Sequence, residues 1–210
     1  MADVLYIHGM GGGSDSRIPS VLRAALAGKG VSVHVRTYDF DPEIASGQIA
    51  SWVDEIGPDL VIGESLGSLH AMRIEGVPHL FVSPALNAPL YFELMAWICL
   101  IPGMSLLFDR IYKPREGDRQ SLHFDFRTLR KYRHHRKSAL ALSTGNRETD
   151  SFLAFIGTRD HYRKTGVVSV RTWKKYFGET LRMYEGTHFM EEGPIYSLLI
   201  PEILKQLNIK

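Results

Sequence analysis

The sequence predicts an α/β fold, a mostly parallel β-sheet with helices on both faces. Short apolar runs of strand length alternate along the chain with longer segments whose apolar residues recur at helical spacing. Several of the short runs are continuously apolar, which is typical of parallel strands buried on both faces. The 210 residues, 44% of them hydrophobic, suffice for one domain with a substantial core.

The expected elements follow one another in regular order. The first run, "VLYIHG", ends in glycine as a buried strand should, and the first helical segment closes at Gly28 and Gly30, which are good stop signals. The next run, "VSVHVRTYD", alternates like a strand. Expected strands are residues 4–9, 31–39, 60–64, 79–85, 151–160 and 180–186, and expected helices are 17–30, 42–57, a segment from Leu66, 167–178 and most of 190–207.

The alternation is interrupted over residues 87–148, which we interpret as an insertion within a single domain of residues 1–210. The insertion opens with the most apolar run of the chain, 88–108. Glu93 and the Pro102–Gly103 break argue against a membrane-spanning helix, which needs about 20 uninterrupted apolar residues. Residues 110–137 then hold ten Lys or Arg and three Asp or Glu, a local charge of +7, whereas the rest of the chain carries −5.

The composition limits which cellular compartment and which classes of partner we expect. One cysteine, Cys99, excludes an internal disulfide and suits a reducing compartment, and the N-terminus shows no signal peptide, so we expect a cytoplasmic protein. The formal charge of +2 is too small to imply a partner, and no nucleic-acid recognition motif occurs. No metal-ligand spacing such as H-E-x-x-H occurs, so no metal site is expected. Oligomeric state is not indicated.

Ser65 is the candidate nucleophile. It stands in "VIGESLGS", between an expected strand and an expected helix, with Gly63 and Gly67 two residues away on either side. The G-x-S-x-G pattern is weak alone, but a sharp strand-to-helix turn exposes such a serine at the carboxyl end of its strand. The following helix directs its first N–H groups toward developing negative charge.

His188 is the candidate base, because a serine hydroxyl needs a neighbouring group to take its proton. It follows the last expected strand, in a loop before the last helix. His34 lies in a strand pattern and His70 in a helix, so both are expected to be structural. His134 and His135 lie in the basic segment. Adjacent side chains on a helix point in different directions, so these two cannot both face one metal ion.

Asp160 is the candidate acid that orients His188. It ends the strand before the one that precedes His188, which gives the chain order Ser65, Asp160, His188. A competing interpretation makes Asp160 a surface-loop residue that caps the following segment. Glu185 is the rival acid, although it lies within an expected strand only three residues from His188.

Two backbone N–H groups are expected to form an oxyanion hole. One is that of Leu66, directly after the nucleophile, and the other comes from the "HGMGGG" loop, with Met10 preferred and Gly11 as the alternative. A dinucleotide-binding loop is disfavoured, because Ser14 stands where G-x-G-x-x-G needs its third glycine.

With these motifs the sequence resembles the α/β-hydrolase superfamily, in particular its small YqiA-like predicted esterases. The matching blocks are "LYIHGMGG", "VIGESLGS", "LFVSPALNAP", "FIGTRD" and "EGTHF". The resemblance implies a reduced sheet of about six strands and a carboxylic-ester or thioester hydrolase without a cofactor, with Ser65, Asp160 and His188 as its triad. Ser68 stands where members of the family frequently have a second glycine after the turn at the serine. The insertion is longer and more basic than in compact members.

The resemblance places a helical lid at the insertion. Its apolar run lines an acyl pocket or packs as core, two interpretations that the sequence leaves open. Within 122–137, Leu122, Phe126 and Leu129 have helical spacing, which predicts a solvated amphipathic lid helix. The basic segment 110–137 has a second interpretation, contact with an anionic group or an acidic membrane surface. The alternative function is a non-catalytic binding protein that docks an anionic partner or membrane surface through this segment.

Overall fold

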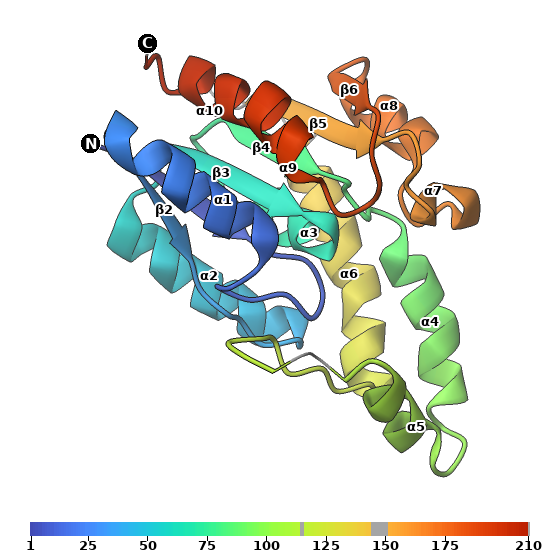
Figure 1. Ribbon diagram of the computed structural model, residues 1–210. Helices are drawn as coiled ribbons and strands as arrows, with labels where there is room; N and C mark the ends of the chain where they lie inside the picture. Colours follow the sequence, from blue (N-terminus) through green and yellow to red (C-terminus); the bar gives the residue numbers. More distant parts are fainter. Residues whose placement is uncertain (114–115, 144–150, 210) are drawn as a thin grey trace.

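Six parallel strands form one sheet. The computed structural model describes residues 1–113, 116–143 and 151–209. The strand order is β2-β1-β3-β4-β5-β6, and every neighbouring pair is parallel (Figure 1). The strands are β1 (Ala2–Ile7), β2 (Val31–Val35), β3 (Leu60–Glu64), β4 (His79–Val82), β5 (Phe152–Gly157) and β6 (Leu181–Tyr184). The predicted parallel sheet of about six strands is therefore confirmed.

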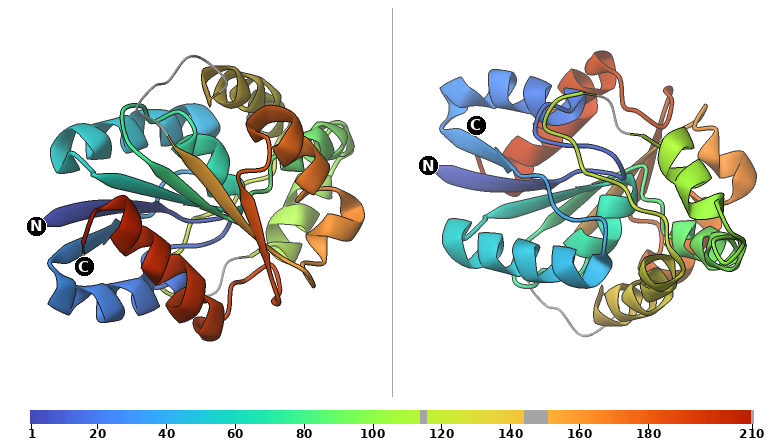
Figure 2. Two further views of the ribbon diagram at one scale, coloured as in Figure 1. Left: turned by 90° about the horizontal axis from the view of Figure 1, so that it is seen from above. Right: turned by 90° about the horizontal axis from the view of Figure 1, so that it is seen from below.

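Helices cover both faces of the sheet, as predicted. They are α1 (Arg17–Leu26), η1 (Ala27–Lys29), α2 (Pro42–Ile56), η2 (Ser65–Gly67), α3 (Ser68–Ala71), α4 (Ala88–Ile98), α5 (Met104–Ile111), α6 (Phe126–Ser143), α7 (Tyr162–Thr165), α8 (Val170–Phe177), α9 (Glu192–Pro194), η3 (Ile195–Leu199) and α10 (Ile200–Gln206). Seen along the sheet, α1 and α10 lie on one side, and α2 and α6 lie on the other (Figure 2).

Each face of the sheet has its own core because successive side chains of a strand point to opposite faces. On β1, Val4 and Tyr6 pack with α1, η3 and α10, whereas Leu5 and Ile7 pack with the helices of the other face. All four side chains are at most 1% exposed. The continuous apolar run of this strand therefore has the cause that the sequence suggested.

Four strands, β2, β4, β5 and β6, are shorter than expected, and for β2 and β4 the difference has a local cause. β2 ends at Val35 rather than at residue 39, where its register with β1 also ends. The residues beyond leave the sheet, and the Tyr38 hydroxyl donates to the His8 carbonyl at 2.5 Å. β4 ends at Val82 because Ser83 has φ +47°, a left-handed conformation that a strand cannot continue through.

The insertion between β4 and β5 contains α4, α5 and α6; residues 114–115 and 144–148 of it lie outside the described residues. The helix expected over 122–137 begins only at Phe126, because Asp125 Oδ1 caps it by accepting the N–H groups of Arg127 at 2.8 Å and Thr128 at 3.0 Å. Leu122, expected within that helix, precedes it.

The helix is amphipathic, as its apolar spacing predicted, and its buried face extends beyond Leu129. The inner face of α6 is core, with these buried side chains: Thr128, Leu129, Tyr132, His135, Ala139 and Leu140. Its outer face keeps the exposed cations Arg127, Arg130 and Arg133. α4 lies along α6 and likewise buries one side, Ala88, Pro89, Phe92 and Ala96. No helix within the described residues is both long and apolar enough to cross a membrane.

Candidate active site

Ser65 occupies a strained turn directly after β3. Its φ is +49°, in the left-handed region that non-glycine residues rarely adopt. The flanking glycines are required by close packing, since a Cβ on Gly67 would lie 2.3 Å from the His8 carbonyl oxygen, and one on Gly63 would lie 2.8 Å from Ser68 Cα. The Ser65 carbonyl accepts the Ala85 N–H at 3.0 Å, which ties the turn to the loop that follows β4.

Three of the candidate residues, distant in sequence, form one hydrogen-bonded chain. Ser65 Oγ lies 3.0 Å from His188 Nε2, and His188 Nδ1 lies 2.8 Å from Asp160 Oδ2. A carboxylate only accepts hydrogen bonds, so Nδ1 carries the imidazole proton and Nε2 is left to accept the Ser65 hydroxyl. His188 and Asp160 are each 3% exposed, whereas Ser65 is half-buried, so the open end of the chain is the serine.

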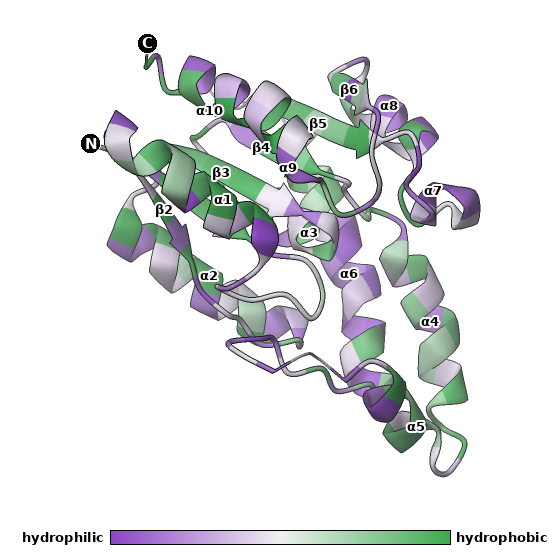
Figure 3. Ribbon diagram, in the orientation of Figure 1, coloured by the Kyte–Doolittle hydropathy of each residue, from purple (hydrophilic) through white to green (hydrophobic). Residues whose placement is uncertain are grey.

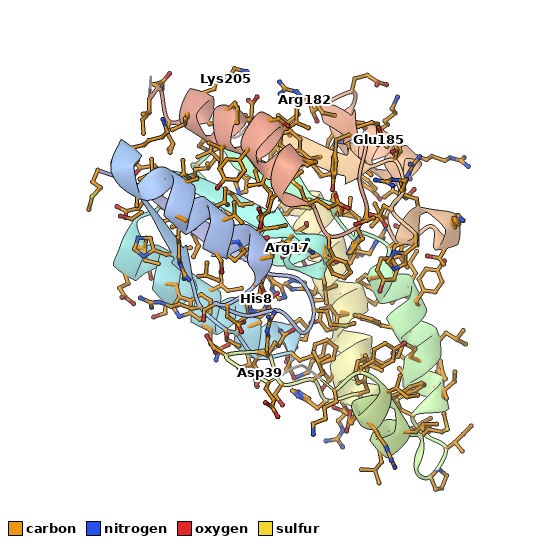
Figure 4. The ribbon with its side chains drawn as sticks, viewed as in Figure 1. His8, Arg17, Asp39, Arg182, Glu185 and Lys205 are labelled. Atoms are coloured by element: carbon orange, nitrogen blue, oxygen red, sulfur yellow. The ribbon has the colours of Figure 1, made fainter. Side chains whose placement is uncertain are left out.

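Asp160 is held in place at both carboxylate oxygens. Oδ1 accepts the Tyr162 N–H at 2.9 Å while Oδ2 faces His188. Burial alone would raise the pKa of Asp160, but the hydrogen bond and charge of His188 and the Tyr162 N–H outweigh it and lower that pKa. The capping role considered for Asp160 thus coexists with its contact to His188. Glu185, the rival acid, is exposed at the rim of the molecule (Figure 4).

Aromatic rings surround the imidazole of His188. The Tyr162 ring meets it edge-on at a centroid distance of 4.6 Å, and the Phe189 ring does so at 5.2 Å. The His161 ring is tilted against the Tyr162 ring at a centroid distance of 4.1 Å and lies 6.0 Å from the His188 ring. These rings limit rotation of the imidazole and give its exposed side an apolar border.

The loop after β1 runs directly beside Ser65. A Cβ on Gly9 would lie 2.9 Å from Ser65 Cβ, so only glycine allows this approach. Gly11 cannot easily offer its N–H to a substrate, because that group donates to Gln120 Oε1 at 3.0 Å. Met10 is next to Gly9, and Leu66 opens the turn after the nucleophile, where helical N–H groups have no intrahelical acceptor. This arrangement favours Met10 over Gly11 as the second oxyanion donor.

A segment of the insertion, residues 117–122, which we call the strap, fixes this loop. The fully buried Gln120 accepts from Gly11, donates its own N–H to the Gly12 carbonyl at 2.7 Å, and bonds the Asp39 carbonyl through Nε2 at 3.3 Å. Leu122 Cδ1 lies 3.5 Å from the position of a Cβ on Gly11.

Charged and hydroxyl groups hold the same strap. Arg119 pairs with Asp15 at 2.8 Å, and Asp118 accepts hydroxyl hydrogen bonds from Ser14 and Thr37. Those two hydroxyls lower the pKa of Asp118. No pattern in the sequence indicated the strap, because 109 residues separate Gln120 from Gly11.

Three buried histidines lie behind the loop and the nucleophile. His8, labelled in Figure 4, stacks on Tyr38 at 4.4 Å, Tyr38 meets His70 at 5.1 Å, and His70 lies 4.3 Å from His135. Burial lowers the pKa of His8 to about 4 and that of His135 to about 3. His70, expected to be structural, is likewise buried, and burial lowers its pKa well below the ordinary value. Among the described residues no group of three or more His, Cys, Asp or Glu could hold a metal.

His34 and His134, the other histidines considered from the sequence, lie outside this cluster. His34 Nε2 lies 2.7 Å from Asp3 Oδ1 at the edge of the sheet. His134 is exposed while its neighbour His135 is buried, so the two diverge as predicted.

Comparison with known proteins identifies the fold. No protein-family model and no curated protein matches the chain. Among solved structures, Est1E from Butyrivibrio proteoclasticus matches at 19% identity and a TM-score of 0.68, over 99% of this chain and 88% of that one.

Two further structures match over nearly their whole length. The monoacylglycerol lipase of Paleococcus ferrophilus has 19% identity and a TM-score of 0.64, over 96% of this chain and 93% of the lipase. Mouse alpha/beta hydrolase domain-containing protein 10 has 12% identity and a TM-score of 0.65, over 98% and 90%. The narrower resemblance to YqiA-like esterases stays a prediction. The six-stranded parallel sheet and its neighbours together show that this chain has the α/β-hydrolase fold.

Proposed function

We propose that the protein is a serine hydrolase that cleaves a carboxylic ester or thioester of a small molecule through an acyl-enzyme. The observation that carries the proposal is the hydrogen-bonded chain from Ser65 through His188 to Asp160, which starts at a serine with a strained left-handed backbone. Structures of similar fold include ones described as a monoacylglycerol lipase, as carboxylesterases and as Est1E with ferulic acid bound, which supports the same class of reaction.

The reaction follows from the positions of the groups. His188 Nε2 takes the hydroxyl proton as Ser65 Oγ attacks the acyl carbonyl, and Asp160 stabilises the imidazolium that forms. The N–H groups of Met10 and Leu66 hold the oxyanion, and a donor of this kind contributes about 3 kcal/mol. His188 then returns the proton to the leaving alcohol or thiol. Water, deprotonated by His188, hydrolyses the acyl-enzyme and releases the acid.

None of these steps needs a cofactor, since the nucleophile, base, acid and oxyanion donors all come from the chain itself. Aromatic rings lie beside His188, where an acyl or leaving group on Ser65 would lie, and Tyr91 of α4 donates a hydrogen bond to the Thr165 carbonyl of α7, the helix that begins with Tyr162. We place the substrate-binding surface there, with the insertion (87–148) acting as a lid.

A fluorophosphonate probe tests the proposal, because it reacts only with an activated serine. We expect the native protein to be labelled and Ser65→Ala to be unlabelled. Ser68→Ala is the matched control: Ser68 lies three residues on in the same turn, and its hydroxyl donates to the Gly63 carbonyl at 3.2 Å, away from His188. Absence of labelling in the native protein, or equal labelling of Ser65→Ala, would contradict the proposal and favour a non-catalytic binding protein. A panel of p-nitrophenyl esters of graded length and acyl-CoAs then defines the substrate.

A further inference from the structure

The helical hairpin formed by α4, α5 and their connection leaves a large apolar surface uncovered. Six of its side chains are each more than half exposed: Leu94 63%, Trp97 54%, Leu100 56%, Ile101 57%, Leu106 74% and Ile111 62%. Figure 3 shows this hairpin extending away from the sheet with hydrophobic residues over α4 and α5. We call these six residues the apolar face. Soluble monomers rarely expose so concentrated an apolar surface unless it binds something.

The apolar face is bordered by positive charge. Arg110 and Lys113 are exposed on and just after α5, and Arg127 and Arg130 are exposed on the first turn of α6. The Arg130 guanidinium lies 5.6 Å from the centroid of the Trp97 ring, so cation and apolar face are in direct contact.

The acidic groups on α4, on α5 and at the start of α6 are occupied within the protein. Glu93, on α4, pairs with Arg133 at 2.5 Å. Asp109, on α5, accepts the Phe124 N–H at 2.8 Å, and Asp125 caps α6. What α4, α5 and the start of α6 offer outward is therefore apolar and cationic.

From this combination we infer that the hairpin docks on an anionic lipid surface, with the apolar face inserted among the acyl chains and the flanking cations at the headgroups. An interfacial helix has this composition, Trp and Leu on one side with Arg and Lys beside them. Trp97 suits the headgroup level, where its ring and N–H meet apolar and polar surroundings together. The charge of −5 on the rest of the chain and +7 on residues 110–137 would orient the molecule hairpin-first toward a negative surface.

A second copy of the chain fits the surface less well. A two-fold symmetric contact through the apolar face would bring the same cationic borders of both copies together, at a cost in repulsion.

Docking on lipid also places the proposed active site near a source of esters. The Tyr91 hydroxyl of α4 donates to the Thr165 carbonyl, on the same short helix α7 that begins with Tyr162. The inference itself concerns binding and does not depend on hydrolysis.

Vesicle flotation tests the inference with the full chain carrying Ser65→Ala, so that binding is measured apart from any turnover. We expect binding to phosphatidylcholine vesicles that contain phosphatidylglycerol, much weaker binding without phosphatidylglycerol, and weakening by salt. Each basic residue near such a surface contributes about 1 kcal/mol, so replacing Arg110, Arg127 and Arg130 by Gln should lower partitioning roughly 100-fold.

Apolar substitutions supply the second arm. Leu94→Asp with Leu106→Asp should lower partitioning at least about 10-fold, because both side chains lose their burial in lipid. Tyr196→Asp, at a side chain 54% exposed on η3, is the matched control and should bind like the parent. Trp97 fluorescence should shift to the blue on binding, and Trp97→Phe should abolish that shift.

Three results would overturn the inference: no binding to anionic vesicles, binding that the hairpin substitutions leave unchanged, or equal loss in Tyr196→Asp. Sedimentation equilibrium adds a fourth. A dimer that Leu94→Asp with Leu106→Asp dissociates would show that a second copy covers the apolar face instead.

Discussion

Replacing Asp160 by Asn tests how the buried carboxylate sets the state of His188. The Tyr162 N–H faces the Oδ1 position at 2.9 Å, so the side-chain oxygen of Asn would be held there and its NH₂ group would occupy the Oδ2 position, 2.8 Å from His188 Nδ1. The NH₂ group donates, which forces Nδ1 to accept and moves the imidazole proton to Nε2. A protonated Nε2 cannot take the proton of Ser65.

The magnitude follows from losing the base while the rest of the site stays intact. A wrong tautomer of this kind lowers kcat about 10⁴-fold, or about 5 kcal/mol of transition-state stabilisation. We expect KM for p-nitrophenyl acetate to change little, since the carboxylate does not touch the acyl group. The assay is steady-state hydrolysis of that ester, with thermal unfolding measured in parallel to establish that the variant is folded.

Glu185→Gln is the matched control, because it makes the same change from carboxylate to amide at an exposed position. Its kcat should stay within about twofold of the native value, as for most surface substitutions. Should Glu185→Gln lose as much activity as Asp160→Asn, or Asp160→Asn keep a kcat within tenfold of native, the assignment of the acid would be wrong.

Three further predictions concern the loop, the turn and the buried histidines. Gln120→Met keeps the volume but removes the acceptor of the Gly11 N–H, so kcat should fall on the order of 10-fold with KM nearly constant; an unchanged kcat in steady-state assays would show that the strap does not position the loop. Gly67→Ala should cost about 3 kcal/mol or more in urea unfolding, because its Cβ would lie 2.3 Å from a backbone oxygen. Gly47→Ala, with open space in mid-helix, should instead gain about 0.5–1 kcal/mol, and equal effects of the two would refute the packing argument. Burial lowers the pKa of His8 to about 4 and that of His135 to about 3, so the unfolded chain binds more protons below its ordinary histidine pKa. Stability should therefore fall with falling pH, by about 3 kcal/mol per pH unit between roughly pH 6 and 4, and a flat urea-unfolding profile over that range would contradict the burial of neutral imidazoles.

The parts of the fold and site that follow strict local rules could be predicted from the sequence. β3 and the turn at Ser65 have a continuous apolar run and two glycines that packing requires, so their pattern is visible within eight residues. Asp160 and His188 could be placed because parallel strands deliver their carboxyl ends to one edge of the sheet. For the acid, the sequence left the choice between Asp160 and Glu185; Asp160 is buried and lies 2.8 Å from His188 Nδ1, whereas Glu185 is exposed.

What could not be predicted depends on contacts between distant segments. Gln120 has no sequence pattern of its own, and its importance arises only when the strap crosses the loop after β1. His135 lies in a run of cations that indicates an exposed face, yet it is buried against His70. Leu122 has helical spacing with Phe126, which predicted a helix from residue 122. The side chain of Asp125 instead caps the helix, so that it begins about one turn later than the apolar spacing indicated.

One segment of the insertion is hydrogen-bonded to the loop beside Ser65, whereas another segment is exposed. This difference determines which parts of the insertion can change between related proteins. Residues 117–122 are hydrogen-bonded to the loop beside Ser65, so a change of length there would displace the backbone of that loop. The connection between α4 and α5, with Ile101, Pro102 and Gly103 all exposed, has no hydrogen bond to the turn at Ser65 among the residues that the structure describes. Related proteins could therefore change the length or the surface residues of this hairpin, and with them what it binds, without changing the candidate active site.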